Sequence, residues 1–186
     1  MAKLLSPEML EAVRSYMLRV ETDVLLKLNT GDHGKKSELR EFLSDLASTS
    51  TRLIVEEEKL QYPSAGPLTF QVKARTKNSE IYFSGIPGGH EFNSLILAIL
   101  QVAGGDLKLD DSIEQYLSRL SVPLSFKAYV SLDCENCPEV VQTLNKFSVL
   151  SELVSTETLD GGLFQDEVQA LGIQGVPTVF LNGELF

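Results

Sequence analysis

The stretch Cys134-Glu-Asn-Cys-Pro-Glu-Val-Val-Gln-Thr-Leu-Asn145 contains both cysteines of the 186-residue chain, as a CxxC pair. It follows an apolar run at 124–130 that the pattern predicts as a strand, and it opens a helix whose inward face carries Val140, Leu144 and Phe147. Two cysteines three residues apart cannot cross-link distant parts of a fold. We therefore expect local redox chemistry or metal binding from this pair.

The position of the pair before a helix is more informative than its spacing. Free backbone N–H groups and the helix dipole stabilise a thiolate at a helix N-terminus, so we expect Cys134 to be the exposed nucleophile with a lowered pKa. Cys137, one turn later, is then placed to resolve a mixed disulfide. The segment Val176-Pro177-Thr178 opens a later strand. A cis peptide bond before Pro177 would turn the preceding backbone outward, toward a bound extended peptide.

The same order of elements is found twice along the chain. Apolar spacing predicts helices at 7–17, 35–47, 90–102 and 111–120, strands at 24–28, 51–55, 68–72, 81–83 and 178–181, and a polar stretch that begins at 56–58. A shift of 101 residues places His33 and Lys36 on Cys134 and Cys137, and the segment 66–70 resembles 176–180 at a shift of 110. We expect two fused α/β units, 1–105 without cysteines and 106–186 with the dithiol.

The end of the second unit differs from that of the first. Asn182-Gly183 is a strong hairpin signal, and the return strand has hardly begun when the sequence ends. We expect the sequence to be a fragment of a longer polypeptide.

Composition excludes several classes of protein. The chain has 16 Lys+Arg against 26 Asp+Glu, a net charge of −10, and 43% hydrophobic residues. These values argue against a disordered tail and against a nucleic-acid binder, which needs a basic face. The longest apolar run, 95–100, is far shorter than the ~20 residues that span a bilayer, and no secretory signal is visible. The use of cysteine favours a cytoplasmic protein with no membrane contact.

Four motifs together resemble one family of the thioredoxin/glutaredoxin superfamily. They are Cys134–Asn145, Asp160-Gly-Gly-Leu-Phe-Gln165, Gly175-Val-Pro-Thr178 and Gly89-His-Glu-Phe92. In this order they resemble the N-terminal domain of the flavoprotein (F) subunit of alkyl hydroperoxide reductase, over essentially the whole chain. The resemblance implies two fused thioredoxin-like folds, with a mixed sheet and flanking helices, the second truncated at its C-terminus.

The resemblance also implies a function. A downstream part of the same chain would bind FAD, oxidise NADH and reduce the disulfide of this domain. Cys134 would then attack the disulfide of a partner peroxiredoxin, and Cys137 would resolve the mixed disulfide. A redox-active Cys134–Cys137 disulfide would be the only redox group of this segment, and the full-length protein is compatible with a homodimer.

Two acidic residues lie close to this motif set and carry expectations of their own. The family places Glu91 near the dithiol, where it could accept a proton from a thiol; the alternative is a solvated carboxylate at a helix N-terminus. The family commonly has His where this chain has Glu135. Glu135 and Asp133 add negative charge beside the nucleophile, so we expect a higher pKa of Cys134 and a more reducing couple than in relatives with His.

Other functions and sites remain as alternatives. A stand-alone glutaredoxin-like disulfide reductase would use the same dithiol on its own substrates. A zinc or peptide-binding module is disfavoured because zinc takes four ligands and only two cysteines are present, so we expect no metal site. The segment 85–89 lacks the Lys of a P-loop and the spacing of a dinucleotide fingerprint, so flavin and nicotinamide are not expected to bind here. His33 and His90 are expected to be surface residues.

Overall fold

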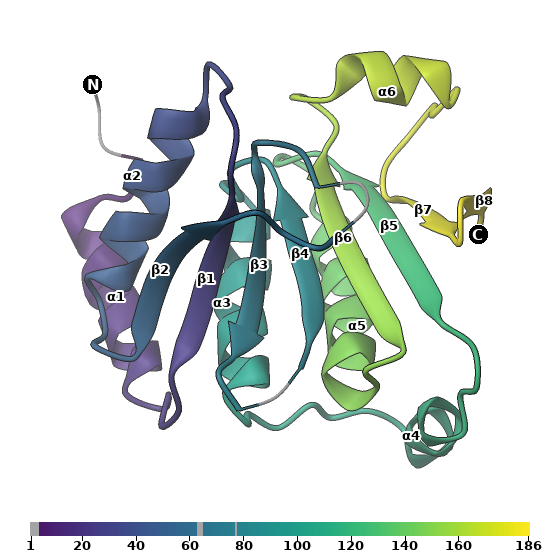
Figure 1. Cartoon of the computed structure of the whole chain (residues 1–186), viewed down its shortest axis with the longest axis horizontal. Helices are drawn as coiled ribbons and strands as arrows, with labels where there is room; N and C mark the ends of the chain where they lie inside the picture. Colours follow the sequence, from purple (N-terminus) through teal and green to yellow (C-terminus); the bar gives the residue numbers. More distant parts are fainter. Residues whose placement is uncertain (1–3, 63–64, 77) are drawn as a thin grey trace.

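The computed structural model describes residues 4–62, 65–76 and 78–186, which form a continuous sheet flanked by helices (Figure 1). The helices are α1 (Pro7–Met17), α2 (Lys36–Ala47), α3 (Glu91–Val102), α4 (Asp111–Ser118), α5 (Cys137–Leu150) and α6 (Gln165–Ala170). The strands are β1 (Val24–Asn29), β2 (Leu53–Glu58), β3 (Thr69–Ala74), β4 (Glu80–Ser84), β5 (Leu124–Val130), β6 (Val154–Asp160), β7 (Thr178–Leu181) and β8 (Glu184–Leu185).

The strands pair in the same way in each half of the chain. The strand order is β2-β1-β3-β4-β6-β5-β7-β8. In the first half β1 runs parallel to β2 and antiparallel to β3; in the second, β5 runs parallel to β6 and antiparallel to β7. Parallel pairing of β4 with β6 joins the two halves into one sheet. The division into units at residue 105 stays a prediction.

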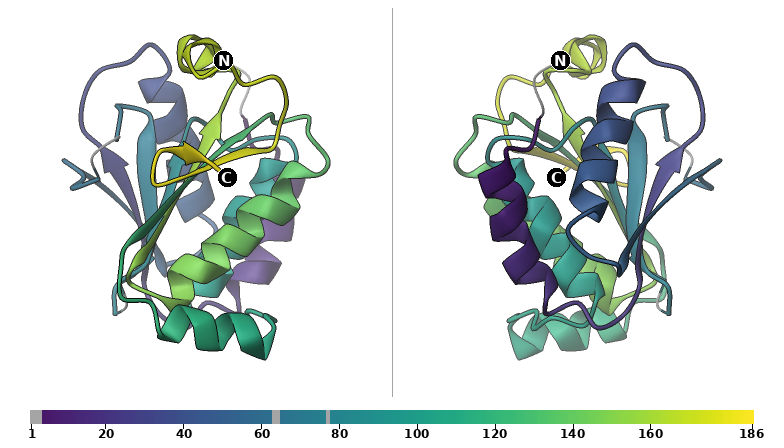
Figure 2. Two further views of the ribbon diagram at one scale, coloured as in Figure 1. Left: turned by 90° about the vertical axis from the view of Figure 1, so that its right-hand side faces the viewer. Right: turned by 90° about the vertical axis from the view of Figure 1, so that its left-hand side faces the viewer.

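The hydrophobic core lies between the sheet and the helices. Helices α1, α3 and α5 lie side by side on one face, with α3 in the middle (Figure 2). The larger core cluster contains residues of both halves, such as Phe70 and Phe83 from the first and Val130 and Val141 from the second. Because one cluster spans both halves, apolar burial and strand pairing both hold the halves together. Helix α6 lies beyond the carboxyl end of β6 (Figure 1).

Most predicted elements are found within two or three residues of their expected bounds. Residues 56–58, which we expected to open a polar stretch, instead complete β2, because they continue the ladder with β1. Strand β6 was not predicted. Its sequence, Val-Ser-Thr-Glu-Thr-Leu-Asp, has no apolar run, yet Thr156, Glu157 and Thr158 are buried at the centre of the sheet.

The sequence match at a shift of 110 is one residue out of register. Phe70 pairs with Leu28, and both belong to the larger core cluster, whereas Phe180 pairs with Lys127. Phe180 therefore faces the opposite side of the sheet from Phe70, and stacks edge-on against Tyr129. Side chains alternate between faces along a strand, so a slip of one residue reverses which face they occupy.

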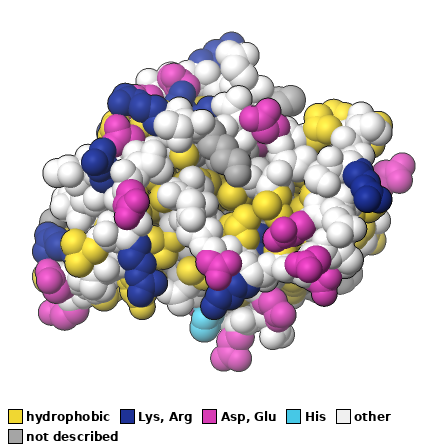
Figure 3. Space-filling model, turned by 90° about the horizontal axis from the view of Figure 1, so that it is seen from below, with side chains coloured by type: hydrophobic (Ala, Val, Ile, Leu, Met, Phe, Trp, Pro, Cys, Tyr) yellow, Lys and Arg dark blue, Asp and Glu magenta, His cyan; other side chains and the backbone are white. Residues whose placement is uncertain are grey.

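Both signs of charge occur at the end of the molecule opposite to the start of α5. Figure 3 shows acidic and basic side chains on this face, with hydrophobic ones between them. No helix among the described residues is long and apolar enough to cross a membrane.

A buried carboxylate lies where the two halves meet. Glu157 on β6 is 2% exposed; it accepts a hydrogen bond of 2.5 Å from the Ser84 hydroxyl on β4, and Lys127 Nζ on β5 lies 3.8 Å away. Lys127 also pairs with Glu167 of α6 at 2.6 Å. The sheet therefore contains a cation that compensates a charge with almost no access to water.

Removing this cation should destabilise the fold. In Lys127→Met, Glu157 stays buried and loses the Lys127 ammonium, and we expect the free energy of unfolding to fall by about 3 kcal/mol in urea titrations at pH 7. Lys27→Met is the matched control: Lys27 occupies the same place on β1, but its partner Glu58 is half exposed. Loss of that solvated pair should cost less than about 1 kcal/mol. Equal losses in the two variants would contradict this account of Glu157.

Candidate redox site at the start of helix α5

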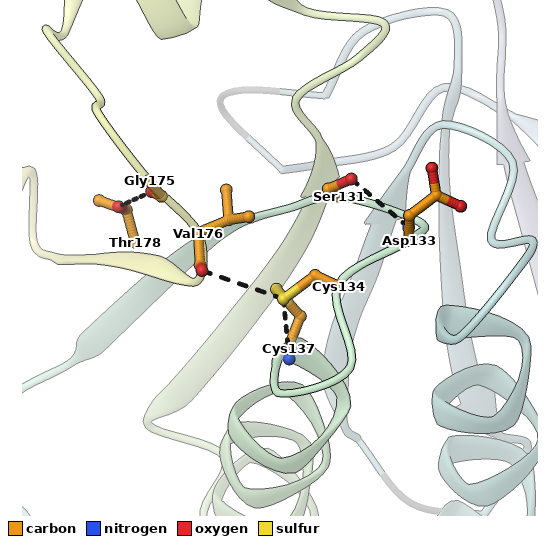
Figure 4. Close-up of a disulfide and its surroundings, with 7 residues drawn as sticks. All are labelled: Ser131, Asp133, Cys134, Cys137, Gly175, Val176 and Thr178. Atoms are coloured by element: carbon orange, nitrogen blue, oxygen red, sulfur yellow. Dashed lines mark hydrogen bonds between the residues drawn. A yellow bond between two sulfur atoms is a disulfide. The ribbon is translucent and has the colours of Figure 1, made fainter.

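The dithiol lies where the sequence predicted it, between β5 and α5. Cys134 and Cys137 form a disulfide with a Cα–Cα distance of 5.5 Å (Figure 4). Cys137 is fully buried as the first residue of α5, and Cys134 is partly exposed in the preceding turn. The prediction that the first cysteine is the accessible one is confirmed. An incoming sulfur can reach Cys134 but not Cys137.

A backbone amide of α5 points at the accessible sulfur. The N–H of Cys137 donates to Cys134 Sγ at 3.1 Å, and Asn136, the N-cap residue, makes no side-chain cap. The sulfur therefore takes the place of a capping oxygen at this helix end. In the reduced state the same amide and the helix dipole would favour a thiolate on Cys134. The Asp133 carboxylate points away from the sulfurs (Figure 4).

The segment before β7 lies against the disulfide from the other side. The Val176–Pro177 peptide bond is cis, as predicted, and the carbonyl oxygen of Val176 lies 3.9 Å from Cys134 Sγ (Figure 4). Val176 is 38% exposed. Thr178 Oγ1 donates to the Gly175 carbonyl at 2.6 Å, closing the turn in which the cis bond lies. Of the predicted peptide-binding segment, Val176 thus lies against the dithiol, while Pro177 carries the cis bond and Thr178 closes the turn.

Glu91 is buried rather than solvated, so the alternative of an exposed helix-terminal carboxylate is wrong. Its side chain is 1% exposed, and neither carboxylate oxygen has a hydrogen-bond partner among the described residues. Burial raises the pKa of Glu91, against smaller opposing effects of Ser94 and His90. The cavity that borders it is only about 10 Å³. In such a place the protonated form of the carboxyl is favoured more than it is in water.

The loop that carries the dithiol also holds the helix that carries Glu91. The N–H of His90 donates to the carbonyl of Leu132 at 2.9 Å. Gly89, at φ +52°, allows this approach, because a Cβ there would collide with the Leu132 carbonyl. Leu132 is two residues before Cys134, and α3 packs along α5. The N-termini of both helices therefore meet at the dithiol loop.

The first half has a lysine at the place of the second cysteine. Lys36, the first residue of α2, is 5% exposed, and its ammonium donates to the carbonyls of Asn29 and Pro67, the latter at 2.8 Å. Burial lowers the pKa of Lys36, and Glu57, 3.6 Å away, opposes that shift. In the first half, the Lys36 ammonium thus joins the start of α2 to the loop before β3. In the second half, the Cys134 sulfur lies beside the carbonyl of Val176 in the loop before β7.

The other candidates behave as surface residues. His33 and His90 are both exposed. Among the described residues no cluster of His, Cys, Asp and Glu could hold a metal ion. Sequence reasoning did not find the roles of the Cys137 amide or of the Leu132 carbonyl, since a backbone group leaves no residue signature. From the sequence, Lys36 was noted only as the residue of the first half that matches Cys137.

Comparison with known proteins agrees with this geometry, although no protein-family model matches the chain. The chain is 39% identical over 182 residues to a protein named NADH dehydrogenase from Ferdinandcohnia aciditolerans, and 36% identical over 183 residues to the F subunit of alkyl hydroperoxide reductase from Staphylococcus epidermidis. These alignments cover 98% of this chain, but only 34% and 35% of the two relatives. The chain therefore spans about a third of the length of the curated relatives it matches.

Solved structures give the same picture for the fold. The NTD_N/C domain of alkylhydroperoxide reductase AhpF from Enterococcus faecalis superposes with a TM-score of 0.86 at 26% identity, covering 98% of this chain and 93% of that one. A protein disulfide oxidoreductase from Aeropyrum pernix superposes with a TM-score of 0.82 at 17% identity, covering 100% and 87%, which bears on the fold alone. The predicted thioredoxin-like α/β fold is confirmed.

The raised pKa of Glu91 predicts that the free energy of unfolding depends on pH. This dependence tests whether the side chain is buried. Between the unfolded-state pKa and the higher folded-state pKa, the folded chain holds more protons, so rising pH lowers the free energy of unfolding. In Glu91→Gln the part of this fall that is due to Glu91 should be absent, so the variant should gain stability relative to the parent as pH rises from 4 to 8 in urea titrations.

The exposed acid Glu139, in the first turn of α5, provides the control. Glu139→Gln should keep the pH dependence of the parent chain. Parallel curves for the parent and Glu91→Gln would show that Glu91 titrates as a solvated carboxylate.

Proposed function

We propose that this chain, which is similar in sequence and fold to the N-terminal domain of the F subunit of alkyl hydroperoxide reductase, is a thiol–disulfide relay. It takes electrons from a flavin-dependent reductase part of the same protein, where FAD and NADH would bind, and passes them to the disulfide of a peroxiredoxin. The observation that carries this proposal is the Cys137 amide directed at the partly exposed Cys134 sulfur at 3.1 Å. The full-length protein would act in the cytoplasm, and a homodimer is compatible with this role.

Bonds and electrons balance at each step of the proposed exchange. Reduction by a donor dithiol breaks the Cys134–Cys137 bond and leaves both cysteines reduced. The Cys134 thiolate attacks one sulfur of the partner disulfide, forming a mixed disulfide and releasing a partner thiolate. Cys137 then loses its proton and attacks Cys134 Sγ, which re-forms the internal disulfide and expels the second partner thiolate. Two electrons have moved to the partner.

Glu91 would be the group that receives the proton of Cys137. Cys137 is fully buried, so its thiol has no direct exchange with water. Glu91 is buried at the start of α3, which is held to the dithiol loop by the His90–Leu132 hydrogen bond. A carboxylate whose pKa is raised by burial accepts a thiol proton more readily than an ordinary one does.

The backbone at Val176 would hold the partner. Its carbonyl lies beside the sulfur and the residue is exposed, so an extended segment around the partner's cysteine can pair with it as a strand. Such pairing would present the partner disulfide to Cys134. Residues 176–178 thus recognise main chain rather than a particular side chain.

The second candidate is a disulfide reductase that acts alone on its own protein substrates. The fold shared with the protein disulfide oxidoreductase from Aeropyrum pernix accommodates that function equally well. The two functions differ in the electron donor. A relay depends on the flavin part of its own chain, whereas a stand-alone reductase accepts electrons from a separate low-molecular-weight thiol.

Electron transfer through the full-length protein tests the relay. We expect NADH oxidation to be coupled to reduction of an oxidised peroxiredoxin, and to be lost in Cys134→Ser and in Cys137→Ser, because either change prevents formation of the internal disulfide. Cys137→Ser should also accumulate a mixed disulfide through Cys134, visible by non-reducing electrophoresis. Undiminished transfer in Cys134→Ser would exclude the relay, and equal transfer with glutathione as sole donor would favour the stand-alone reductase.

The acidic neighbour of the nucleophile gives a second prediction. Glu135 is exposed and adjacent to Cys134, so Glu135→His removes a negative charge and adds a positive one at low pH. We expect the pH midpoint of Cys134 alkylation in the reduced chain to fall. Glu152→His, at an exposed position beyond α5, is the control and should leave it unchanged. An unaltered midpoint in Glu135→His would remove this role of Glu135.

A further inference from the structure

A groove crosses the helical face of the molecule, away from the disulfide. Two hollows of about 670 and 490 Å³ lie along α3 and share Leu97, Leu100 and Gln142. The first lies between α1 and the first turns of α3; the second lies between the end of α3 and α5. Figure 2 shows the three helices side by side on this face. The groove thus runs the length of α3.

The first hollow is lined largely by apolar side chains, and several of them are open to solvent. Met9 and Tyr16 of α1 and Leu97 of α3 are all exposed. Leu100 and Ile96 lie beneath them. Contiguous exposed apolar side chains on a soluble protein mark a surface that binds something.

One end of the groove carries unpaired positive charge. Arg19, Lys108 and Lys146 line the second hollow, together with the single acid Asp106. None of the three cations forms an ion pair with a described residue, whereas eight other Lys and Arg side chains do. The chain as a whole carries a net charge of −10. A local cationic end on an acidic protein attracts an acidic ligand.

The length of the groove favours a segment of polypeptide over a small molecule. Helix α3 has 12 residues, which corresponds to about 18 Å at 1.5 Å per residue. A small ligand would fill one hollow, whereas a helix of three turns can place side chains at i, i+3 or i+4 and i+7 along both. Grooves between packed helices also accept a further helix by the usual interdigitation of side chains.

We propose that this groove binds an acidic amphipathic helix of a partner protein, with its apolar face on Leu97 and Leu100 and its carboxylates paired with Arg19, Lys108 and Lys146. The site is separate from the dithiol and from the exposed backbone at Val176. It gives the chain a second surface through which a partner can be held during thiol exchange. The proposal does not depend on which protein receives the electrons.

Selection from a displayed library of random dodecapeptides tests the proposal without assuming a sequence. We expect the 186-residue chain to enrich acidic peptides with apolar residues at helical spacing. The enriched peptides should bind the variant Arg19→Glu/Lys146→Glu at least about tenfold more weakly, with an affinity that falls as salt is raised. Arg119→Glu is the matched control and should bind as the parent does, since Arg119 is another cation without an ion pair among the described residues, at a hollow beside α4.

Several outcomes would overturn the proposal. Peptides without acidic bias, or acidic peptides that bind Arg19→Glu/Lys146→Glu as tightly as the parent, would exclude the charged groove as their site. Self-association of the chain that is abolished by Leu97→Asp, measured by analytical ultracentrifugation, would show instead that this face joins two copies. Thermal melts followed by circular dichroism establish that each variant is folded, and loss of electron transfer would bear only on the relay.

Discussion

A single hydrogen bond joins the fold of this chain to its chemistry. The first amide of α5 is one of the N–H groups at a helix start that have no partner within the helix, and it is directed at the sulfur of Cys134. The helix has no side-chain cap of its own, so the sulfur occupies the position where the helix dipole most favours negative charge. The cis peptide bond at Val176, the burial of Cys137 and the position of α3 all arrange groups around that sulfur.

The surrounding architecture explains how a helix end can be held so closely. The sheet is continuous across both halves, and one core cluster contains side chains from each. The half without cysteines contributes Glu91 on α3 and the tie between His90 and Leu132. Its own equivalent of the dithiol is replaced by Lys36, which binds two carbonyls. The first half therefore supports the site in the second and has no exchangeable sulfur of its own.

Sequence reasoning found the parts of the site that depend on residue identity. CxxC before a helix and proline before a strand are local patterns, and both lie where they were expected. Two kinds of feature were not predicted from the sequence. Strand β6 has four consecutive polar residues, 155–158, which hide it from a search for apolar runs. Its buried Glu157 is compensated by Ser84 and Lys127, and such partners are invisible along the chain. The burial of Glu91 also depends on packing between helices that are far apart along the chain, which helix periodicity does not report.

The register of the internal repeat was the other error, and it has a physical cause. Matching segments suggested that Phe70 corresponds to Phe180, yet the ladders place these two side chains on opposite faces of the sheet. The carbonyl contacts agree: Lys36 reaches the carbonyl of Pro67, and Cys134 lies beside that of Val176. Backbone position, rather than the identity of the side chain, is what the two halves share.

The reactivity of Cys134 tests the account most directly. In reduced protein carrying Cys137→Ser, which keeps the amide but isolates one thiol, the rate of alkylation by iodoacetamide is measured against pH. The account predicts a midpoint well below about 8.5, the value of a free cysteine, and a return toward that value when the protein is unfolded in urea. A midpoint at or above that of the unfolded chain would contradict it, because the helix end would then provide no stabilisation of the thiolate.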